Sequence, residues 1–533
     1  MKEIDFMAPL TEKPATDEDE APPFDYEPRE SDEREHQDEP DDDREHDGSL
    51  PPATNGHASG PRVAPTVDLL RFPLTDLGNA ERLVAVHGAG LRYVPLWNRW
   101  LAWTGSRWAP DPQSVRVYRA AKGMVRELVR VAAAVKDDER RKALLSFALA
   151  CEGKKLLGAM VSLAQNEPAV HADHTDFDRD PMLLNVANGT IDLRTGDLRP
   201  HRREDMITKI SPVEYDPQAK CPRFDRFLLE VMNEDAELVA FVLAFLGYCL
   251  TGDVREHVVS FWHGKGGNGK GVLGAAILHV MGDYAIKAAP DLLFRSDMTD
   301  RHPTELADLH GKRLVICNET TRGRAWDEGT LKDCTGGDRI RARRMREDFW
   351  EFDPTHKLVV WGNHKPVIRN VDDAMRRRLR LVPFAVSFVG REDKGLVPAL
   401  QREAPGILRR LVEGSIRWQE KGLPDAAAVR ASTDGYLQDE DTLGQFFAEE
   451  CIFAPDAKVT RKALRDAYVA WSAERDEKPV GAKVFAQRLR DRGALDRRIR
   501  TEAGSRAGWV GVRLVTDAER PAPDEPGTQV ELV

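Results

Sequence analysis

The stretch 258-VVSFWHGKGGNGKGVLGAAILHVMG-282 places a short apolar segment, a glycine-rich loop and an apolar helix in immediate succession. Val258–Trp262 is typical of a buried strand, and Val272–Met281 is typical of a buried helix. The glycines between them let the backbone curl so that its N–H groups can point at phosphate oxygens. Lys270 lies at the start of the helix, where its ammonium and the free helix-terminal amides both favour an anion. The spacing G-x-x-x-x-G-K therefore predicts a phosphate-binding loop for ATP.

The predicted contacts to ATP are the loop residues themselves. They are Gly264, Gly266, Gly267, Asn268, Gly269, Lys270 and Gly271. The last position departs from the usual pattern, in which a Ser or Thr follows the lysine and its hydroxyl binds Mg²⁺. Because no hydroxyl follows in the next three residues either, the sequence leaves two alternatives open. Either other groups and water hold the Mg²⁺, or turnover is weak.

The net charge of −11 comes from one end of the chain. Residues 1–50 contain 20 of the 89 acidic and 5 of the 78 basic side chains, which leaves 69 acidic and 73 basic ones for the rest. An acidic, proline-rich segment with few aromatic residues cannot bury enough apolar surface to fold, so residues 1–66 are predicted to be disordered. The remaining chain is slightly basic, as expected for a protein that contacts nucleic acid.

The rest of the composition is that of a protein without a membrane span or a disulfide framework. The longest apolar run, Leu238–Leu250, is too short to cross a bilayer and is predicted to be a buried helix. The six cysteines are scattered without a CxxC pair, which argues against a zinc module and fits a reducing compartment. We therefore expect a cytoplasmic protein.

Composition and pattern divide the chain into seven segments. They are a disordered acidic tail (1–66), an N-terminal α+β region (67–215), a helical collar (216–254), the α/β nucleotide domain (255–390), a helical linker (391–441), a small basic domain (442–516) and a second disordered tail (517–533). Within the N-terminal region we expect a β-meander over Leu91–Trp108, helices over Val115–Val135 and Ala143–Leu163, and a hairpin over 183–201. The tryptophans of the meander are expected to pack in a core, although interleaved arginines leave base stacking as an alternative.

The small basic domain has the element order of a winged helix. A helix capped by Thr460 and a helix over Lys483–Arg492 precede two predicted strands, Arg497–Arg500 and Trp509–Val515, joined by a turn over Gly504–Gly508. The second helix contributes Lys483, Arg488 and Arg492 as candidate DNA contacts. A solvated basic face is the alternative.

A phosphate-binding loop needs further groups to hydrolyse ATP. The apolar strand Leu314–Cys317 leads into Asn318 and Glu319, and we predict that Glu319 orients the attacking water and, with Asn318, binds Mg²⁺. The strand Lys357–Trp361 leads to Asn363, whose amide could contact the γ-phosphate. Arg377 or Arg378, in a run of three arginines before another apolar strand, is the candidate arginine finger from a neighbouring subunit.

Between these motifs lies 331-LKDCTGGDRIRARRMREDFWEF-352. Alternation with small and apolar residues places Arg339, Arg341 and Arg343 on one face of a strand. Arg344 and Arg346 would lie near the tip of a hairpin, and Lys332 precedes it. A row of guanidinium groups is suited to a single-stranded phosphate backbone, so all six are candidate DNA contacts, with an ordinary solvated strand as the alternative.

The ordered motifs GKGGNGKG, LVICNE, LKDCTGGDRIRAR, KLVVWGNHKP and DDAMRRRLRLVPF resemble those of superfamily 3 helicases of the phage/plasmid primase family, related to poxvirus-type primase–helicases. The block LLNVANGTIDLRTG resembles the helicase-associated region of that family. The resemblance implies an AAA+-like ATPase core with a C-terminal winged helix, ATP and Mg²⁺ as cofactors, and a homo-hexameric ring that translocates on single-stranded or forked DNA.

The same resemblance raises the question of a primase. Larger relatives carry a primase domain before this region, and the 66 residues that precede it here are too few for one, so we expect a separate primase or polymerase partner. Two other functions stay open on the residues alone. One is a nucleotide-gated origin binder or loader with little hydrolysis, favoured by Gly271 and Asn318. The other, a small-molecule kinase, would not need the arginine hairpin.

Overall fold

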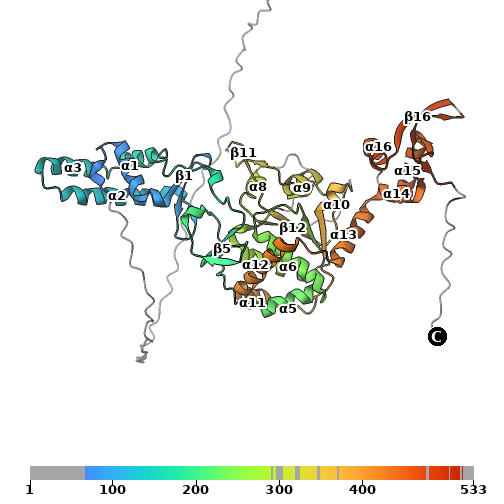
Figure 1. The fold of residues 1–533 in the computed structure, drawn as a ribbon, viewed down its shortest axis with the longest axis horizontal. Helices are drawn as coiled ribbons and strands as arrows, with labels where there is room; N and C mark the ends of the chain where they lie inside the picture. The colour runs from blue at the N-terminus through green and yellow to red at the C-terminus, as the bar shows by residue number, and fades with distance from the viewer. Residues whose placement is uncertain are drawn as a thin grey trace, which may run out of the picture. The chain divides into compact units, whose positions relative to one another are not determined.

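The computed structural model describes residues 67–289, 292–295, 304–318, 324–344, 348–368, 371–475, 479–502, 504–516 and 519 (Figure 1). The two predicted tails, apart from residue 519, and the predicted site residues Glu319 and Arg346 lie outside this set.

The centre of the nucleotide domain is a five-stranded parallel sheet with the order β13-β7-β12-β9-β8. The strands are β7 (Val259–His263), β8 (Ala285–Lys287), β9 (Leu314–Asn318), β12 (Lys357–Gly362) and β13 (Leu379–Pro383). The helices between them are α7 (Lys270–Met281), α8 (Thr304–Ala307), α9 (Glu328–Thr335) and α10 (Asp373–Arg378). The predicted strand–loop–helix unit is confirmed, and its helix begins two residues earlier than expected, at Lys270.

Both faces of this sheet are buried, which explains why its strands read as continuous apolar runs. In β9 and β12, Ile316 and Val359 point into one core, while Val315, Leu358 and Val360 point into the other. The first core also contains side chains of α7 and of four helices from outside the sheet. These are α5 (Pro222–Val231), α6 (Ala236–Leu250), α11 (Leu396–Arg402) and α12 (Ala404–Lys421).

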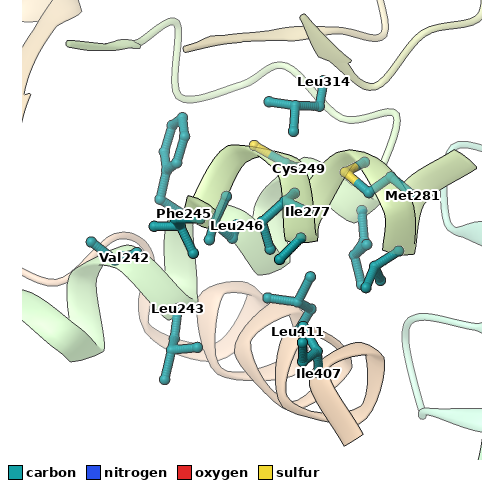
Figure 2. Packing of buried hydrophobic residues seen from close by; sticks show 14 of the residues in the cluster. Val242, Leu243, Phe245, Leu246, Cys249, Ile277, Met281, Leu314, Ile407 and Leu411 are labelled. Atoms are coloured by element: carbon teal, nitrogen blue, oxygen red, sulfur yellow. The ribbon is translucent and has the colours of Figure 1, made fainter. Parts of the chain in front are cut away.

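The apolar run Leu238–Leu250 is the buried helix α6, as predicted, and it lies directly against α12 (Figure 2). Two glycines permit this contact. A Cβ on Gly247 would lie 2.2 Å from the backbone nitrogen of Ser415, and one on Gly414 would lie 2.3 Å from the carbonyl oxygen of Leu243. The two helix backbones therefore touch where any larger side chain would separate them.

The second core receives a helix that the sequence suggested as part of a linker. Helix α13 (Ala427–Glu440) packs against β13, and its Tyr436 is fully buried. The hydroxyl of Thr433 accepts a hydrogen bond of 2.9 Å from the backbone N–H of Leu381 in β13. Its charged residues conceal a three- to four-residue spacing of buried side chains, so the segment is helical as expected but belongs to the body of the nucleotide domain.

The N-terminal region contains two small antiparallel sheets and a group of helices. The first sheet comprises β1 (Leu91–Val94), β2 (Arg99–Trp103) and β3 (Trp108–Pro110), and the second comprises β4 (Leu183–Val186), β5 (Gly189–Asp192) and β6 (Asp197–Arg199). The helices are α1 (Asp76–His87), α2 (Val115–Ala133), α3 (Asp138–Ala150) and α4 (Lys154–Ala164). The predicted meander and hairpin are confirmed, and Trp100 and Trp108 are buried in cores. The single helix expected over 143–163 is wrong, because the extended backbone of Gly153 separates α3 from α4.

The C-terminal unit begins with α14 (Thr442–Glu450) and has its own core. Its other elements are β14 (Cys451–Ile452), β15 (Lys458–Thr460), α15 (Arg461–Glu474), α16 (Ala482–Asp491), β16 (Leu495–Thr501), β17 (Gly504–Val510) and β18 (Arg513–Leu514). Thr460 caps α15 as predicted. The turn expected over Gly504–Gly508 is wrong, since these residues form the first part of β17 and pair with β16 up to Thr501.

Two chemical findings concern the described part of the chain as a whole. All six cysteines are buried, and none of them forms a disulfide with another in the part of the chain that the structure describes. None of the helices among the described residues has the length and apolar character needed to span a bilayer.

Candidate functional site

Three of the predicted site segments meet at one edge of the sheet because parallel strands end on the same side. His263 at the end of β7 is in register with Gly362 of β12, and Trp361 of β12 is in register with Asn318 of β9. The glycine loop follows β7 directly, and Asn363 follows β12 directly. The carboxyl edge of a parallel sheet is where open α/β folds bind ligands.

Lys270 and Asn363, which are 93 positions apart, are in contact at this edge. The Lys270 ammonium donates hydrogen bonds to the carbonyl of Gly264 at 2.6 Å and to Asn268 Oδ1 at 3.0 Å, and it lies 3.4 Å from Asn363 Oδ1. Burial lowers the pKa of Lys270 to about 8. All three partners are neutral oxygens, so among the residues that the structure describes the Lys270 ammonium has no acidic partner and is available to an anion.

The glycine loop is held against the segment that follows β13. The Asn268 side-chain amide donates to the carbonyl of Phe384 at 3.1 Å, and the Phe388 backbone N–H donates to the carbonyl of Gly267 at 2.7 Å. Gly267 and Gly269 have φ values of +72° and +86°, a conformation that larger residues rarely adopt. The loop conformation is thus fixed both by its glycines and by its neighbours.

A pocket of about 610 Å³ opens between this loop and the ends of β9 and β12. Six of the seven predicted ATP contacts line it, from Gly266 to Gly271, together with Asn318 and Asn363. Gly264 contributes its carbonyl to Lys270 instead. Lys287 at the end of β8 and Trp361 in β12 also line the pocket and were not predicted from the sequence. Lys287 ends a strand of only three residues, which is too short to be recognised by its pattern.

The side chains at the pocket suit a nucleotide with its Mg²⁺. The Oδ1 atom of Asn318 is buried at the pocket and has no hydrogen-bond partner among the residues that the structure describes. A buried amide oxygen without a partner is costly and is an acceptable ligand for Mg²⁺ or for a water bound to it. A Cβ on Gly271 would meet nothing within 4 Å, so crowding does not explain the missing hydroxyl. No cluster of three His, Cys, Asp or Glu that could hold a metal occurs within the described ranges.

The three candidate arginines of α10 differ in their surroundings. Arg376 pairs with Asp441 at 3.0 Å. The Arg378 Nε donates to the hydroxyl of Thr335 at 3.0 Å, which engages this guanidinium within the subunit. Arg377 is exposed and its Nε contacts the carbonyl of Asp373 at 3.3 Å. Of the two residues predicted as an arginine finger, Arg377 is therefore the freer one.

The predicted arginine hairpin is confirmed as an antiparallel pair of short strands, β10 (Ile340–Ala342) and β11 (Trp350–Phe352). The guanidinium groups of Arg341 and Arg343 lie 4.5 and 4.7 Å from the ring centre of Phe349, so both extend on one side of the hairpin.

The flanking basic residues of the hairpin make weaker or structural contacts. Arg339 pairs with exposed Asp353 at 3.1 Å, and Arg344 lies 3.8 Å from Asp308. Lys332 donates to Asp372, the residue that caps α10, at 2.6 Å.

The candidate contacts of α16 also differ from one another. Lys483 is exposed at the start of the helix, whereas Arg488 forms an ion pair of 2.7 Å with Asp441. Arg492 is exposed at the end of α16, and its guanidinium lies 4.8 Å from the ring centre of Phe447. Arg488 thus has a structural partner, and Lys483 and Arg492 are available at the surface.

Two protein families match different parts of the chain. Residues 80–233 match the family described as "D5 N terminal like", and residues 262–378 match the "Family of unknown function (DUF5906)". The second match begins in β7 and ends at Arg378, and so covers the glycine loop, Asn363 and the arginine hairpin.

The curated relatives are viral proteins of greater length. The chain is 29% identical over 219 residues to the "Putative helicase L207/L206" of Acanthamoeba polyphaga mimivirus, a match to 40% of this chain and 23% of that protein. It is 26% identical over 388 residues to the "Putative helicase 022R" of Frog virus 3 (isolate Goorha), covering 55% and 38%. It is 24% identical over 325 residues to the "Putative primase C962R" of African swine fever virus (strain Badajoz 1971 Vero-adapted), covering 55% and 34%. The chain therefore spans well under half of the length of these relatives.

Among solved structures, the apo NrS-1 C-terminal region aligns with 81% of this chain and 98% of its own, at 10% identity and a TM-score of 0.42. Two regions of the chain are therefore similar to a D5 N-terminal-like region and to DUF5906, and its viral relatives are named putative helicases and primases.

Proposed function

We propose that this protein is an ATP-dependent DNA helicase of a phage, prophage or plasmid, of the superfamily 3 type, acting in DNA replication. The observation that carries the proposal is the contact between Lys270 and Asn363 in a pocket at the carboxyl edge of a parallel sheet. The names of the viral relatives, putative helicases and primases, support a role in replication.

In this proposal each residue has a defined task. The Lys270 ammonium neutralises the β- and γ-phosphates of ATP, the loop N–H groups bind their oxygens, and Asn363 contacts the γ-phosphate. Mg²⁺, when bound, would neutralise charge on the transferring phosphoryl group, and Asn318 would hold it directly or through water. Glu319, outside the described residues, would orient the attacking water. Arg377 would reach the ATP of a neighbouring subunit in an AAA+-like homo-hexamer, with Arg378 as the alternative.

DNA is proposed to contact two basic surfaces. One is the β10–β11 hairpin, on which Arg341 and Arg343 lie side by side. The other is the C-terminal unit, whose helices α15 and α16 and three-stranded sheet β15-β17-β16 are compatible with a winged helix. Single-stranded and forked DNA would be the substrates, a separate primase or polymerase a partner, and the cytoplasm the place of action.

The test is ATP hydrolysis with and without single-stranded DNA, followed by strand separation on a forked substrate. We expect DNA-stimulated hydrolysis that falls at least about a hundredfold in Lys270→Ala, Glu319→Gln and Arg377→Ala. Lys265→Ala is the matched control, because this loop lysine is exposed and does not line the pocket. ATP binding without turnover in the wild-type protein would contradict the helicase.

That outcome would favour the second candidate, a nucleotide-gated origin binder or loader with little hydrolysis. Gly271 is the observation in its favour, because a loop without the hydroxyl ligand can bind a nucleotide and still hydrolyse it poorly. Such a protein would assemble on DNA when ATP is added and would not separate strands.

A further inference from the structure

A second cavity, of about 220 Å³, lies between the N-terminal region and the nucleotide domain, and basic side chains from both line it. The N-terminal region contributes Arg99 from β2, Arg107 from the β2–β3 turn, and Lys209. The nucleotide domain contributes Lys312, just before β9, and Arg344, just after β10. Its lining residues differ from those of the glycine-loop pocket, so it is a separate site.

Positive charge exceeds negative charge in this cavity. Among the described residues of its lining, the one acidic side chain is that of Asp283, which forms an ion pair with Arg107. Lys312 donates to the backbone carbonyl of the same aspartate at 2.8 Å. The Lys209 ammonium has neither an ion pair nor a hydrogen bond to any residue in the part of the chain that the structure describes, although the carboxylate of Asp178 is near enough to influence it electrostatically.

Two of these cations have acidic partners, Arg107 in Asp283 and Arg344 in Asp308, whereas Lys209 and Lys312 form no ion pair within the part of the chain that the structure describes. Burial lowers the pKa of Lys209, and the positive charges of Arg107 and Arg344 lower it further against the opposing effect of Asp178. Burial and the charge of Lys209 lower the pKa of Lys312 to about 8. Like charges that share a partly buried site are unfavourable unless an anion joins them.

The walls of the cavity indicate which kind of anion fits. Trp97, His310 and Trp350 are in edge contact, with ring centres 5.8 Å apart for the first pair and 4.9 Å apart for the second. Since these rings already pack on one another, a base is not expected to stack there. The volume is also below the range of about 300–1,000 Å³ that is usual for small-molecule sites, which favours a phosphate group over a whole nucleotide.

The arginine hairpin leads to this cavity. Arg344 follows β10 by two residues, and Trp350 begins β11 opposite Ala342. Arg341 and Arg343 therefore present their guanidinium groups on the same hairpin that closes one side of the cavity. Arg341 and Arg343 lie on the exposed face of the hairpin, whereas Trp350 lies on its buried face, toward the cavity. A backbone bound along these arginines would therefore reach the cavity by way of Arg344, the residue next to Arg343.

We propose that this cavity binds a phosphate of single-stranded DNA at the base of the hairpin, with Lys209 and Arg107 of the N-terminal region and Lys312 of the nucleotide domain as its ligands. The inference rests on the proposed DNA-binding role of the hairpin and extends it to the N-terminal region. It makes the D5 N-terminal-like region part of the DNA path, so a strand bound there would bridge the two regions.

The test measures binding of a fluorescein-labelled oligo(dT) of about 30 nucleotides to the full chain, without ATP, over a range of salt concentrations. We expect Lys209→Gln and Lys312→Gln each to weaken binding about tenfold. The slope of log affinity against log salt should become shallower by about 0.7 for each lost phosphate contact. Lys209→Arg should restore much of the affinity, which separates loss of charge from loss of fold. Lys122→Gln, on the exposed side of α2, is the control and should bind as wild type.

Competition identifies the ligand. Unlabelled oligo(dT) should displace the probe. RNA of the same length should also displace it, because the proposed contacts are to a phosphate group that DNA and RNA share. Displacement from this site by inorganic phosphate or ATP at equal phosphate concentration would instead assign it to a free phosphate and overturn the proposal. Unchanged DNA affinity and salt slope in Lys209→Gln would also overturn it.

A failure of this inference can be told from a failure of the proposed function. The Lys209→Gln variant should bind a fluorescent ATP analogue as the wild-type protein does. A wild-type protein that binds DNA through Lys209 but never hydrolyses ATP would contradict the helicase and leave the phosphate cavity intact.

Discussion

At the scale of single residues, Gly271 stands where the usual phosphate-binding loop has a Ser or Thr. It is the second residue of α7, and a side chain there would have free space around its Cβ. Gly271→Ser should therefore be accommodated without distortion, should favour the helix by about 0.5 kcal/mol, and should supply the hydroxyl that the usual loop offers to Mg²⁺. We expect the Mg²⁺ concentration for half-maximal binding of an ATP analogue to fall several-fold.

The control for that experiment is Gly271→Ala, which adds the Cβ without the hydroxyl. Both variants should gain helix stability, and the serine variant alone should respond to Mg²⁺. If alanine and serine shift the Mg²⁺ dependence equally, the hydroxyl has no role, and Asn318 and its neighbours hold the ion without help from this position.

Lys270 makes nucleotide binding dependent on pH. Its pKa is lowered to about 8 by burial, so the ammonium that attracts phosphate predominates below pH 8 and is lost as the pH rises through that value. Above pH 8, binding must also take up a proton, and affinity for an ATP analogue should fall by about tenfold per pH unit. Titration calorimetry between pH 7 and 9.5 measures this slope. Lys270→Arg, whose guanidinium stays protonated, should show a flat profile, and an equal slope in that variant would assign the effect to another group.

At the scale of secondary-structure elements, the contact between α6 and α12 depends on Gly247 and Gly414. Because a Cβ on Gly414 would lie 2.3 Å from the carbonyl oxygen of Leu243, Gly414→Ala must push two helices of the main core apart. We expect a loss of about 1–3 kcal/mol in stability, seen as a lower midpoint of thermal unfolding of the nucleotide domain.

Gly435→Ala is the matched control on α13, where a Cβ would meet nothing within 4 Å. It should raise stability by about 0.5–1 kcal/mol, because alanine loses less backbone freedom than glycine when a helix forms. Equal stability of the two variants would mean that α6 and α12 can separate at no cost, contrary to the close packing of Figure 2.

At the scale of the whole molecule, the sequence predicted well what is set by local pattern. The strand–loop–helix unit, β9, β12 and the arginine hairpin were predicted, with the ends of β9 and β12 one residue short and the start of α7 two residues late, because each is encoded in a run of fewer than 25 residues. The contact of Lys270 with Asn363 was not predicted, although both were predicted at the nucleotide, and it arises because parallel strands share one edge for their carboxyl ends.

What the sequence did not predict depends on contacts between distant residues. The strand order β13-β7-β12-β9-β8 is a property of long-range pairing, and so is the place of Lys287 at the nucleotide pocket. The buried position of Tyr436 in a charged segment and the pairing of Arg488 with Asp441, 47 positions away, were missed for the same reason. Local pattern contains no information on which partner a side chain meets across the fold.

The proposed assembly of several subunits can be tested through Arg377. If Arg377 acts on the ATP of a neighbouring subunit, then Arg377→Ala and Lys270→Ala subunits are each inactive alone but can complement each other when mixed. An intact Lys270 pocket in one subunit would then meet an intact Arg377 from the next. We expect an equimolar mixture to hydrolyse ATP well above the sum of the two variants, because an arginine finger contributes about 10³–10⁵ in rate.

Arg376→Ala is the control for surface charge, since Arg376 is engaged by Asp441, and its mixture with Lys270→Ala should show only the activity that Arg376→Ala retains by itself. If the mixture of the Arg377 and Lys270 variants does not hydrolyse ATP, Arg377 acts in the site of its own subunit. The main reason to propose a ring of subunits is then lost.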